Sequence, residues 1–173
     1  MNILELFQPI RTFVFDVDGV LTDGTVLVLD DGQQVRGMNV RDGYALQLAV
    51  RKGYRVAVIS GGEAGAVRIR LEKLGVQDIF LGVADKEAVL DEYMGRHSIT
   101  KGEVLYMGDD MPDYPPMERV GLPCCPVDSA TEILRLAKYI SPLPGGRGCV
   151  RDVIEKVLKL NDAWMIEPGL RSR

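Results

Sequence analysis

Two groups of aspartates stand out in the sequence because each one follows directly after a short apolar run. Asp16 and Asp18 lie in FVFDVDGV, while Asp109 and Asp110 follow VLYMG, with Asp113 close behind. Burying an unpaired carboxylate is costly or shifts its pKa. Acidic pairs at the ends of buried strands therefore indicate a bound cation, a catalytic role or both, with a solvated strand-end pair as the plain alternative.

The five carboxylates would converge if the two apolar runs form neighbouring strands of one sheet. Such a cluster of oxygen ligands, with no histidine or cysteine nearby, favours Mg²⁺. Asp113 has a second interpretation, because its position behind Met111 and Pro112 also suits a residue that caps the next helix. The sequence thus predicts a magnesium site and leaves the role of Asp113 open.

Phosphate-binding features follow two other predicted strands. Ser60 ends the run VAVIS, and the backbone N–H groups of Gly61 and Gly62 then lead into a predicted helix, whose start attracts phosphate. Ser60 equally suits a plain helix N-cap. Lys86 opens another predicted helix, where a positive charge opposes the helix dipole, so an anionic partner is expected. A surface lysine is the ordinary alternative.

The elements that must position these residues alternate between strands and helices. The apolar, β-branched runs predict strands at Thr12–Asp16, Arg55–Ser60, Ile79–Leu81, Glu103–Met107 and Gly121–Cys125. Helical spacing of apolar residues predicts helices at Asp42–Lys52, Glu63–Leu74, Lys86–Arg96, Pro112–Val120, Ser129–Leu136 and Arg151–Leu160. This alternation predicts an α/β fold, a doubly wound parallel sheet. An Asp-Gly dipeptide between two alternating runs predicts a small β-hairpin at about 25–40.

Length and composition limit the domain count and the function classes. The 173 residues, 46% apolar and 27% charged, predict one globular domain at 1–161 and a flexible polar tail at 162–173. A net charge of -4 without a basic stripe argues against a nucleic-acid partner. The absence of a leader-like start and of a membrane-length apolar run predicts a cytoplasmic protein. Three cysteines, two of them adjacent, indicate reduced core residues rather than disulfides or a metal site.

Together these signals resemble the haloacid dehalogenase superfamily of phosphohydrolases. The resemblance rests on DVDG, the serine after the second strand, the lysine before the third helix, and GDDMPD, in the family's order. It implies that Asp16 is the nucleophile that attacks phosphorus, and that Asp18 protonates the leaving alkoxide and then activates water. It also implies that Mg²⁺ is held by Asp16, by the backbone carbonyl of Asp18 and by Asp109.

The same resemblance implies how the transferring phosphoryl group is bound. Ser60, with the neighbouring Gly61, and Lys86 would contact it. Asp113 would support Lys86 or a metal-bound water, with Asp110 as a further supporting residue. These roles suit phosphoryl transfer, which needs mainly positioning and neutralisation of charge.

The short distance between the first two motifs leaves no room for a cap domain. The hairpin, NVRDGYALQLAVRKG and GGRGCVRDVIEKVL resemble the capless 3-deoxy-D-manno-octulosonate 8-phosphate phosphatases of lipopolysaccharide synthesis. That resemblance implies a homotetramer in which a neighbour's segment around Gly145–Gly148 helps to close the site. Arg147 and Arg68 are candidate contacts to the sugar acid, and Arg147 equally suits a surface residue. A related phosphatase of nine-carbon, sialic-acid-type keto acid 9-phosphates is the alternative. Gly62 stands where this branch often has a charged, sugar-facing side chain and leaves that contact to other residues, while VRDGY resembles the eight-carbon branch more.

Other classes fit the sequence less well. A phospho-acceptor receiver domain also uses an aspartate, a serine, a lysine and Mg²⁺, but its acceptor should follow the third strand, where only Asp85 stands. A phosphomutase would need a cap, and a non-catalytic module would be expected to lack Asp16 or Asp18. The sequence therefore predicts a Mg²⁺-dependent phosphoric monoester hydrolase.

Overall fold

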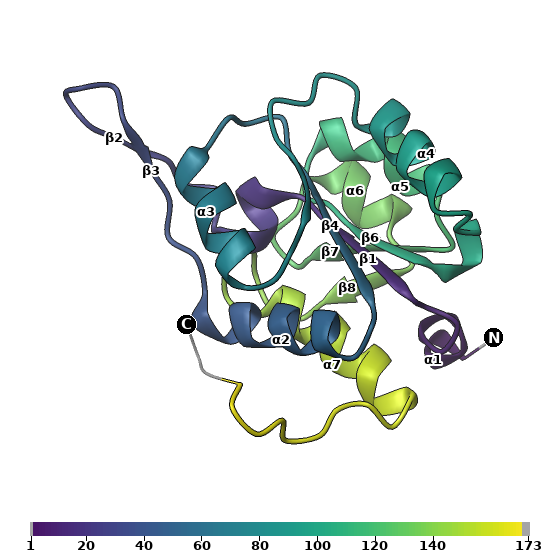
Figure 1. Cartoon of the computed structure of the whole chain (residues 1–173). Helices are drawn as coiled ribbons and strands as arrows, with labels where there is room; N and C mark the ends of the chain where they lie inside the picture. The colour runs from purple at the N-terminus through teal and green to yellow at the C-terminus, as the bar shows by residue number, and fades with distance from the viewer. Residues whose placement is uncertain (1, 171–173) are drawn as a thin grey trace.

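The central element of the protein is a six-stranded parallel sheet flanked by helices (Figure 1), seen in a computed structural model that describes residues 2–170. The strand order is β5-β4-β1-β6-β7-β8, and every neighbouring pair is parallel. The strands are β1 (Thr12–Phe15), β4 (Arg55–Ile59), β5 (Asp78–Phe80), β6 (Val104–Met107), β7 (Leu122–Pro126) and β8 (Tyr139–Ser141). The predicted doubly wound α/β fold is confirmed, although the short edge strand β8 was not predicted.

Helices cover both faces of the sheet. They are α1 (Ile3–Phe7), α2 (Val40–Arg51), α3 (Gly65–Lys73), α4 (Lys86–Arg96), α5 (Tyr114–Glu118), α6 (Thr131–Leu136) and α7 (Cys149–Leu160). One core packs α1, α2, α3 and α7 against one face, and a second packs α4, α5 and α6 against the other. No helix within residues 2–170 is long and apolar enough to cross a membrane.

The central strands are apolar throughout because both of their faces are buried. In β1, Phe13 and Phe15 point into the first core and Val14 points into the second. Successive side chains of a strand point to opposite faces, so a strand covered on both sides needs a continuous apolar run rather than an alternating one. The apolar run stops at Asp16, the residue directly after the end of β1, which is itself buried.

The hairpin extends away from the body of the molecule (Figure 1). Its strands, β2 (Leu27–Val28) and β3 (Gln34–Val35), pair antiparallel and are shorter than the predicted span of 25–40. Leu27 and Val28 are 60% and 67% exposed, and Val35 is also exposed. The hairpin therefore presents apolar side chains that its own chain does not cover.

The segment that follows α7 contacts the surface of the domain at several points. Trp164 packs edge-on against Tyr44 with ring centroids 6.3 Å apart, and the guanidinium of Arg151 lies 5.2 Å from the Trp164 ring. Lys52 Nζ lies 2.7 Å from Glu167 Oε2. These contacts hold part of the expected flexible tail against α2 and α7, while its last residues, 171–173, lie outside the described part of the chain.

A buried carboxylate joins α2 to α7. Asp42, in the first turn of α2, accepts a 2.7 Å hydrogen bond from the backbone N–H of Arg151, in the first turn of α7. Its second oxygen, Oδ2, is buried and has no hydrogen-bond partner among the described residues. Burial raises the pKa of Asp42 to about 6, and the hydrogen bond from Arg151 only partly offsets this effect.

The raised pKa of Asp42 predicts a specific pH dependence of stability. The folded protein holds this proton more tightly than the unfolded chain, so the group stabilises the fold fully below its unfolded pKa of 3.8. That contribution is lost as the pH rises through about 6, at a cost of up to roughly 3 kcal/mol. Asp42→Asn should therefore gain stability relative to wild type at neutral pH but not near pH 4, as measured by urea unfolding.

Asp85→Asn is the matched control, because Asp85 also accepts a helix-start hydrogen bond, from the N–H of Ala88, but is exposed. The change in unfolding free energy caused by Asp85→Asn should differ little between neutral pH and pH 4. An Asp42→Asn effect of equal size at both pH values would show that burial of this carboxylate does not set the pH dependence.

Candidate active site

The predicted site residues gather where the chain leaves the sheet on either side of β1. The central strand β1 lies between β4 and β6, and the connections that follow these strands lead to helices on different faces. In open α/β sheets this arrangement leaves a crevice at the carboxyl ends of the strands, where ligands bind. A pocket of about 310 Å³ lies there, lined by Asp16, Asp18, Gly24, Ser60, Gly61, Gly62, Lys86, Asp109, Asp110, Pro112 and Asp113.

The centre of the pocket is the buried ammonium group of Lys86. Its Nζ lies 3.0 Å from Asp16 Oδ1 and 2.8 Å from Asp113 Oδ1. Burial pulls the pKa of Lys86 down, but the two carboxylates outweigh it and hold the pKa above its ordinary value. Asp113 also accepts hydrogen bonds from the Tyr106 hydroxyl at 2.8 Å and from the Asp109 backbone N–H at 3.1 Å. Lys86 is thus a fixed, charged group of the site and not a surface lysine.

Negative charge exceeds positive charge in this cluster. Oxygens of Asp16, Asp109 and Asp113 lie within 4.8 Å of one another. Burial and then repulsion from Asp113 raise the pKa of Asp16 to about 8, against the opposing effect of Lys86. Burial, with the charges of Asp113 and Asp110, raises the pKa of Asp109 to about 7. A divalent cation would favour the ionised carboxylates, and these hard oxygen ligands fit Mg²⁺.

A tight turn after β1 carries Asp18 into the pocket and leaves space for Asp109, which follows β6. Asp16 Oδ1 accepts a 2.7 Å hydrogen bond from the N–H of Val17, and the turn continues through Gly19 with φ of +84°. A Cβ on residue 19 would stand 1.9 Å from Asp109 Oδ2. Glycine is required at this position because of both the left-handed backbone and the close approach of the Asp109 carboxylate.

Ser60 is buried at the end of β4, and its hydroxyl accepts a 3.3 Å hydrogen bond from the N–H of Gly62. The following helix, α3, begins only at Gly65, so Ser60 is not its N-cap and the expected start at Glu63 was too early. The hydroxyl and the glycine loop lie directly on the pocket. Ser60 therefore faces the position that a phosphoryl group would occupy.

The neighbouring motif resolves the open question about Asp113. Asp110 is exposed, and its carboxylate accepts a 2.8 Å hydrogen bond from the N–H of Met111, so Asp110 caps the short helical turn that follows. Asp113 stands at the N-cap position of α5, but its side chain makes no capping hydrogen bond and instead holds Lys86. The expected position of Asp113 at the start of the helix is therefore confirmed, whereas the side-chain cap in this motif comes from Asp110 and belongs to the preceding turn.

Arg68 and Arg147 do not reach the catalytic pocket of their own chain. Arg68 donates a 3.1 Å hydrogen bond to the backbone carbonyl of Ile79, and Arg147 is exposed with Nη2 3.7 Å from Asp23 Oδ2. The loop Gly145–Gly148 packs against the turn after β1, where a Cβ on Gly145 would stand 2.0 Å from the carbonyl oxygen of Gly19. Within one chain, this loop supports the active-site turn.

Two functional contacts were missed in the sequence. Arg36, on the hairpin, forms an ion pair with Asp18, in which Nε lies 2.7 Å from Oδ1 and Nη2 lies 3.2 Å from Oδ2. Tyr106 resembles a core residue of β6, although its hydroxyl holds Asp113. No local pattern marks either contact, because each depends on how segments distant in sequence pack together.

The residue that a receiver domain would need as phospho-acceptor is placed unsuitably. Asp85 is exposed, and it caps α4 by accepting a 2.9 Å hydrogen bond from the N–H of Ala88. The acidic residues of the pocket instead follow β1 and β6. This arrangement agrees with the phosphohydrolase interpretation.

Comparisons with known proteins agree with this geometry. No family model matches the chain. The 3-deoxy-D-manno-octulosonate 8-phosphate phosphatase KdsC of Escherichia coli K12 is 34% identical over 166 residues, which cover 94% of this chain and 88% of that protein. The phosphatase of the same name from Yersinia pestis is 32% identical over 169 residues, covering 98% of this chain and 90% of the relative.

Solved structures give the same result. The crystal structure of the Yersinia pestis 3-deoxy-D-manno-octulosonate 8-phosphate phosphatase has a TM-score of 0.92 at 31% identity, covering 99% of this chain and 91% of that one. The Moraxella catarrhalis phosphatase, solved in complex with magnesium, phosphate and KDO, has a TM-score of 0.88 at 30% identity, covering 91% of both chains. The chain therefore belongs to the 3-deoxy-D-manno-octulosonate 8-phosphate phosphatase family of the haloacid dehalogenase superfamily.

Proposed function

We propose that this protein is a Mg²⁺-dependent phosphatase that hydrolyses 3-deoxy-D-manno-octulosonate 8-phosphate to the free sugar acid and phosphate. The observation that carries the proposal is the meeting of Asp16, Asp18, Ser60 and Lys86 with three further aspartates around one pocket. Identity of 34% to the Escherichia coli enzyme supports the choice of substrate.

In the first step, an oxygen of Asp16 attacks phosphorus and the bond to the sugar oxygen breaks. The phosphoryl group becomes an acyl phosphate on Asp16, and Asp18 gives its proton to the leaving alkoxide. Lys86 and Ser60 bind the phosphoryl oxygens, and Asp113 keeps Lys86 in place at 2.8 Å. Proton donation matters here because a sugar alkoxide is a poor leaving group.

In the second step, Asp18 takes a proton from water, which attacks phosphorus and releases phosphate from Asp16. The carboxylate nucleophile thereby divides one difficult hydrolysis into two easier steps. Mg²⁺, held by Asp16, Asp109 and the backbone carbonyl of Asp18, would neutralise charge on the phosphoryl oxygens. The shortage of positive charge among these carboxylates supports that assignment.

The organisation of the enzyme follows from the same features. We infer a single catalytic domain at 1–161 without a cap, because one sheet with its two cores spans this range. We also propose a cytoplasmic homotetramer that serves lipopolysaccharide synthesis. The exposed Leu27 and Val28 of the hairpin support assembly, since an uncovered apolar surface is typical of an interface.

Substrate and metal are tested together by measuring phosphate release. We expect Mg²⁺-dependent release from 3-deoxy-D-manno-octulosonate 8-phosphate to exceed that from nine-carbon keto acid 9-phosphates and from hexose phosphates, and EDTA to abolish it. Asp16→Asn is the control that assigns the activity to this site. Preference for a nine-carbon acid would move the substrate assignment to the sialic-acid type, and release that survives EDTA would contradict the metal assignment.

Assembly through the hairpin is tested by sedimentation velocity. Wild type should sediment as a tetramer, and the double substitution Leu27→Ser with Val28→Ser should dissociate it, because the apolar contact is lost. Leu4→Ser, at an exposed leucine of α1, is the control and should leave the tetramer intact. A monomeric wild type, or an unchanged double variant, would rule out this interface.

A further inference from the structure

The general acid of the proposed mechanism has a partly exposed side chain with few partners from its own, otherwise buried, turn. The Asp18 side chain is 34% exposed, and its contact with the Thr22 hydroxyl is long, at 3.5 Å. A carboxyl group that must deliver its proton to the leaving oxygen, and as a carboxylate then take a proton from water, needs a fixed orientation, because small displacements of a catalytic group reduce the rate severely. The turn alone does not supply that orientation.

Arg36 supplies it from the hairpin. The guanidinium contacts both oxygens of Asp18, with Nε 2.7 Å from Oδ1 and Nη2 3.2 Å from Oδ2. Such two-point pairing fixes direction as well as distance. The Arg36 side chain is only 6% exposed, so this is not a loose surface ion pair. The contact spans 18 residues of sequence and connects the hairpin to the first motif.

Two features of the surroundings show that the pair is specifically accommodated. A Cβ on Gly62 would stand 3.4 Å from Asp18 Oδ2 and 3.5 Å from Arg36 Nη2, so a longer side chain there would compete with the guanidinium for this space. Arg36 Nη1 is buried without a hydrogen-bond partner among the described residues. An unsatisfied buried donor costs stability, so maximal stability of the fold does not explain this placement.

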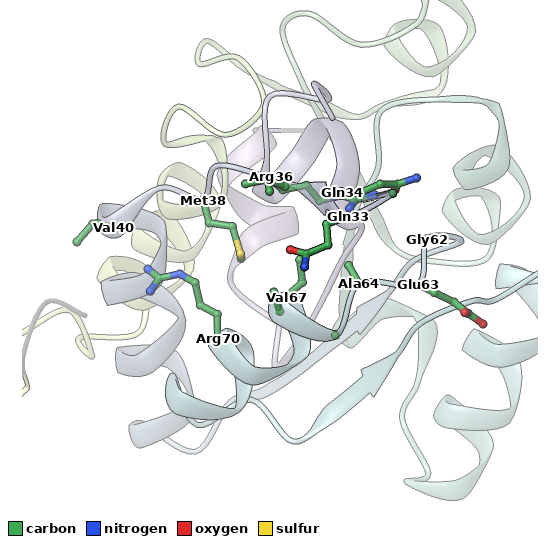
Figure 2. Close-up of a pocket in the computed structure, with 14 residues that line it drawn as sticks. Gln33, Gln34, Arg36, Met38, Val40, Gly62, Glu63, Ala64, Val67 and Arg70 are labelled. Atoms are coloured by element: carbon green, nitrogen blue, oxygen red, sulfur yellow. Dashed lines mark hydrogen bonds between the residues drawn. The ribbon is translucent and has the colours of Figure 1, made fainter. Parts of the chain in front are cut away.

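Arg36 also lines a groove that shares Gly62 with the catalytic pocket. A groove of about 1050 Å³ runs between the hairpin and α3, and Figure 2 shows Arg36 and Gly62 among the residues that line it. Gly62 also lines the catalytic pocket, so the groove adjoins the pocket beside Asp18. The catalytic pocket, at about 310 Å³, is the smaller of the two. The leaving group can therefore extend from the pocket, past Asp18, into the groove.

We propose that Arg36 is a positioning residue that orients Asp18 for proton transfer to the leaving oxygen, and that it does so from the hairpin. This inference rests on the proposed role of Asp18 as the general acid. It predicts that the importance of Arg36 depends on the leaving group. A sugar alkoxide needs the proton, whereas p-nitrophenolate leaves without it.

The kinetic test compares Arg36→Gln with wild type on the sugar-acid phosphate and on p-nitrophenyl phosphate. The ratio kcat/KM reports the steps up to release of the alcohol. It should fall about tenfold or more for the sugar-acid phosphate, chiefly through kcat, and little for the aryl ester. Arg36→Lys keeps one charged donor, so its kcat/KM for the sugar-acid phosphate should lie between the values for wild type and Arg36→Gln. Equal losses on both substrates, or a loss confined to KM, would overturn the proposal.

Arg119→Gln is the matched control, because Arg119 also contacts both oxygens of an aspartate, Asp91, but on the exposed surface near α4 and α5. It should leave both activities unchanged. An equal leaving-group effect in this variant would show that Arg36 has no special connection to the site.

A second measurement does not depend on activity. In a double-mutant cycle of Arg36→Gln and Asp18→Asn, each variant's urea midpoint is compared with that of wild type. The shift of the double variant should differ from the sum of the two single-variant shifts, because the residues interact directly. Additive shifts would overturn the pairing. A wild-type enzyme inactive on every phosphate ester would instead count against the proposed function, while the cycle would still test the contact.

Discussion

The contact between Lys86 and two carboxylates is the interaction on which the rest of the site depends. Its ammonium group lies between Asp16 and Asp113, and these three residues come from the end of β1, the start of α4 and the turn after β6. A buried charge is tolerable only when it is paired and hydrogen-bonded. The Lys86 contact therefore joins three separate segments through one requirement, that no charge in the pocket be left alone.

That requirement is only partly met by the protein itself. Three carboxylates share a single lysine, and the raised pKa values of Asp16 and Asp109 show that burial opposes their ionisation. This shortage of positive charge suits a phosphatase, because it favours binding of a divalent cation beside the nucleophile. Two glycines allow the carboxylates to lie this close together. Gly19 lets the Asp109 carboxylate approach the turn after β1, and Gly145 packs directly against the same turn.

The sequence predicted well those features that depend on local pattern and strand order. Apolar runs that stop at an aspartate located the carboxyl ends of β1 and β6, and parallel strands necessarily bring such ends together. It predicted poorly whatever depends on a single turn or a distant contact. The helix after Ser60 begins later than expected, and the carboxylate that caps the turn after β6 is that of Asp110, while Asp113 stands at the start of α5 without capping it. The apolar pattern does not determine such local backbone geometry.

Contacts between distant segments had no signal at all in the sequence. Arg36 reaches Asp18 from the base of the hairpin, directly after β3, and Arg68 turns away from the pocket to a carbonyl of β5. Arg68 was expected to contact the sugar acid and Arg36 was not considered, so only the geometry of the fold separates the two arginines. The edge strand β8 was missed because its three residues, Tyr139–Ser141, form no continuous apolar run.

The measurement that tests the central claim most directly is the location of the phosphoryl group during turnover. Enzyme, Mg²⁺ and substrate are mixed and quenched with acid at short times. The protein is then digested, and the peptide masses are measured by mass spectrometry. We expect one added phosphoryl group on the peptide that contains Asp16, and none in Asp16→Asn. A phosphoryl group on another residue, or full turnover without a phosphorylated peptide at any quench time, would contradict it.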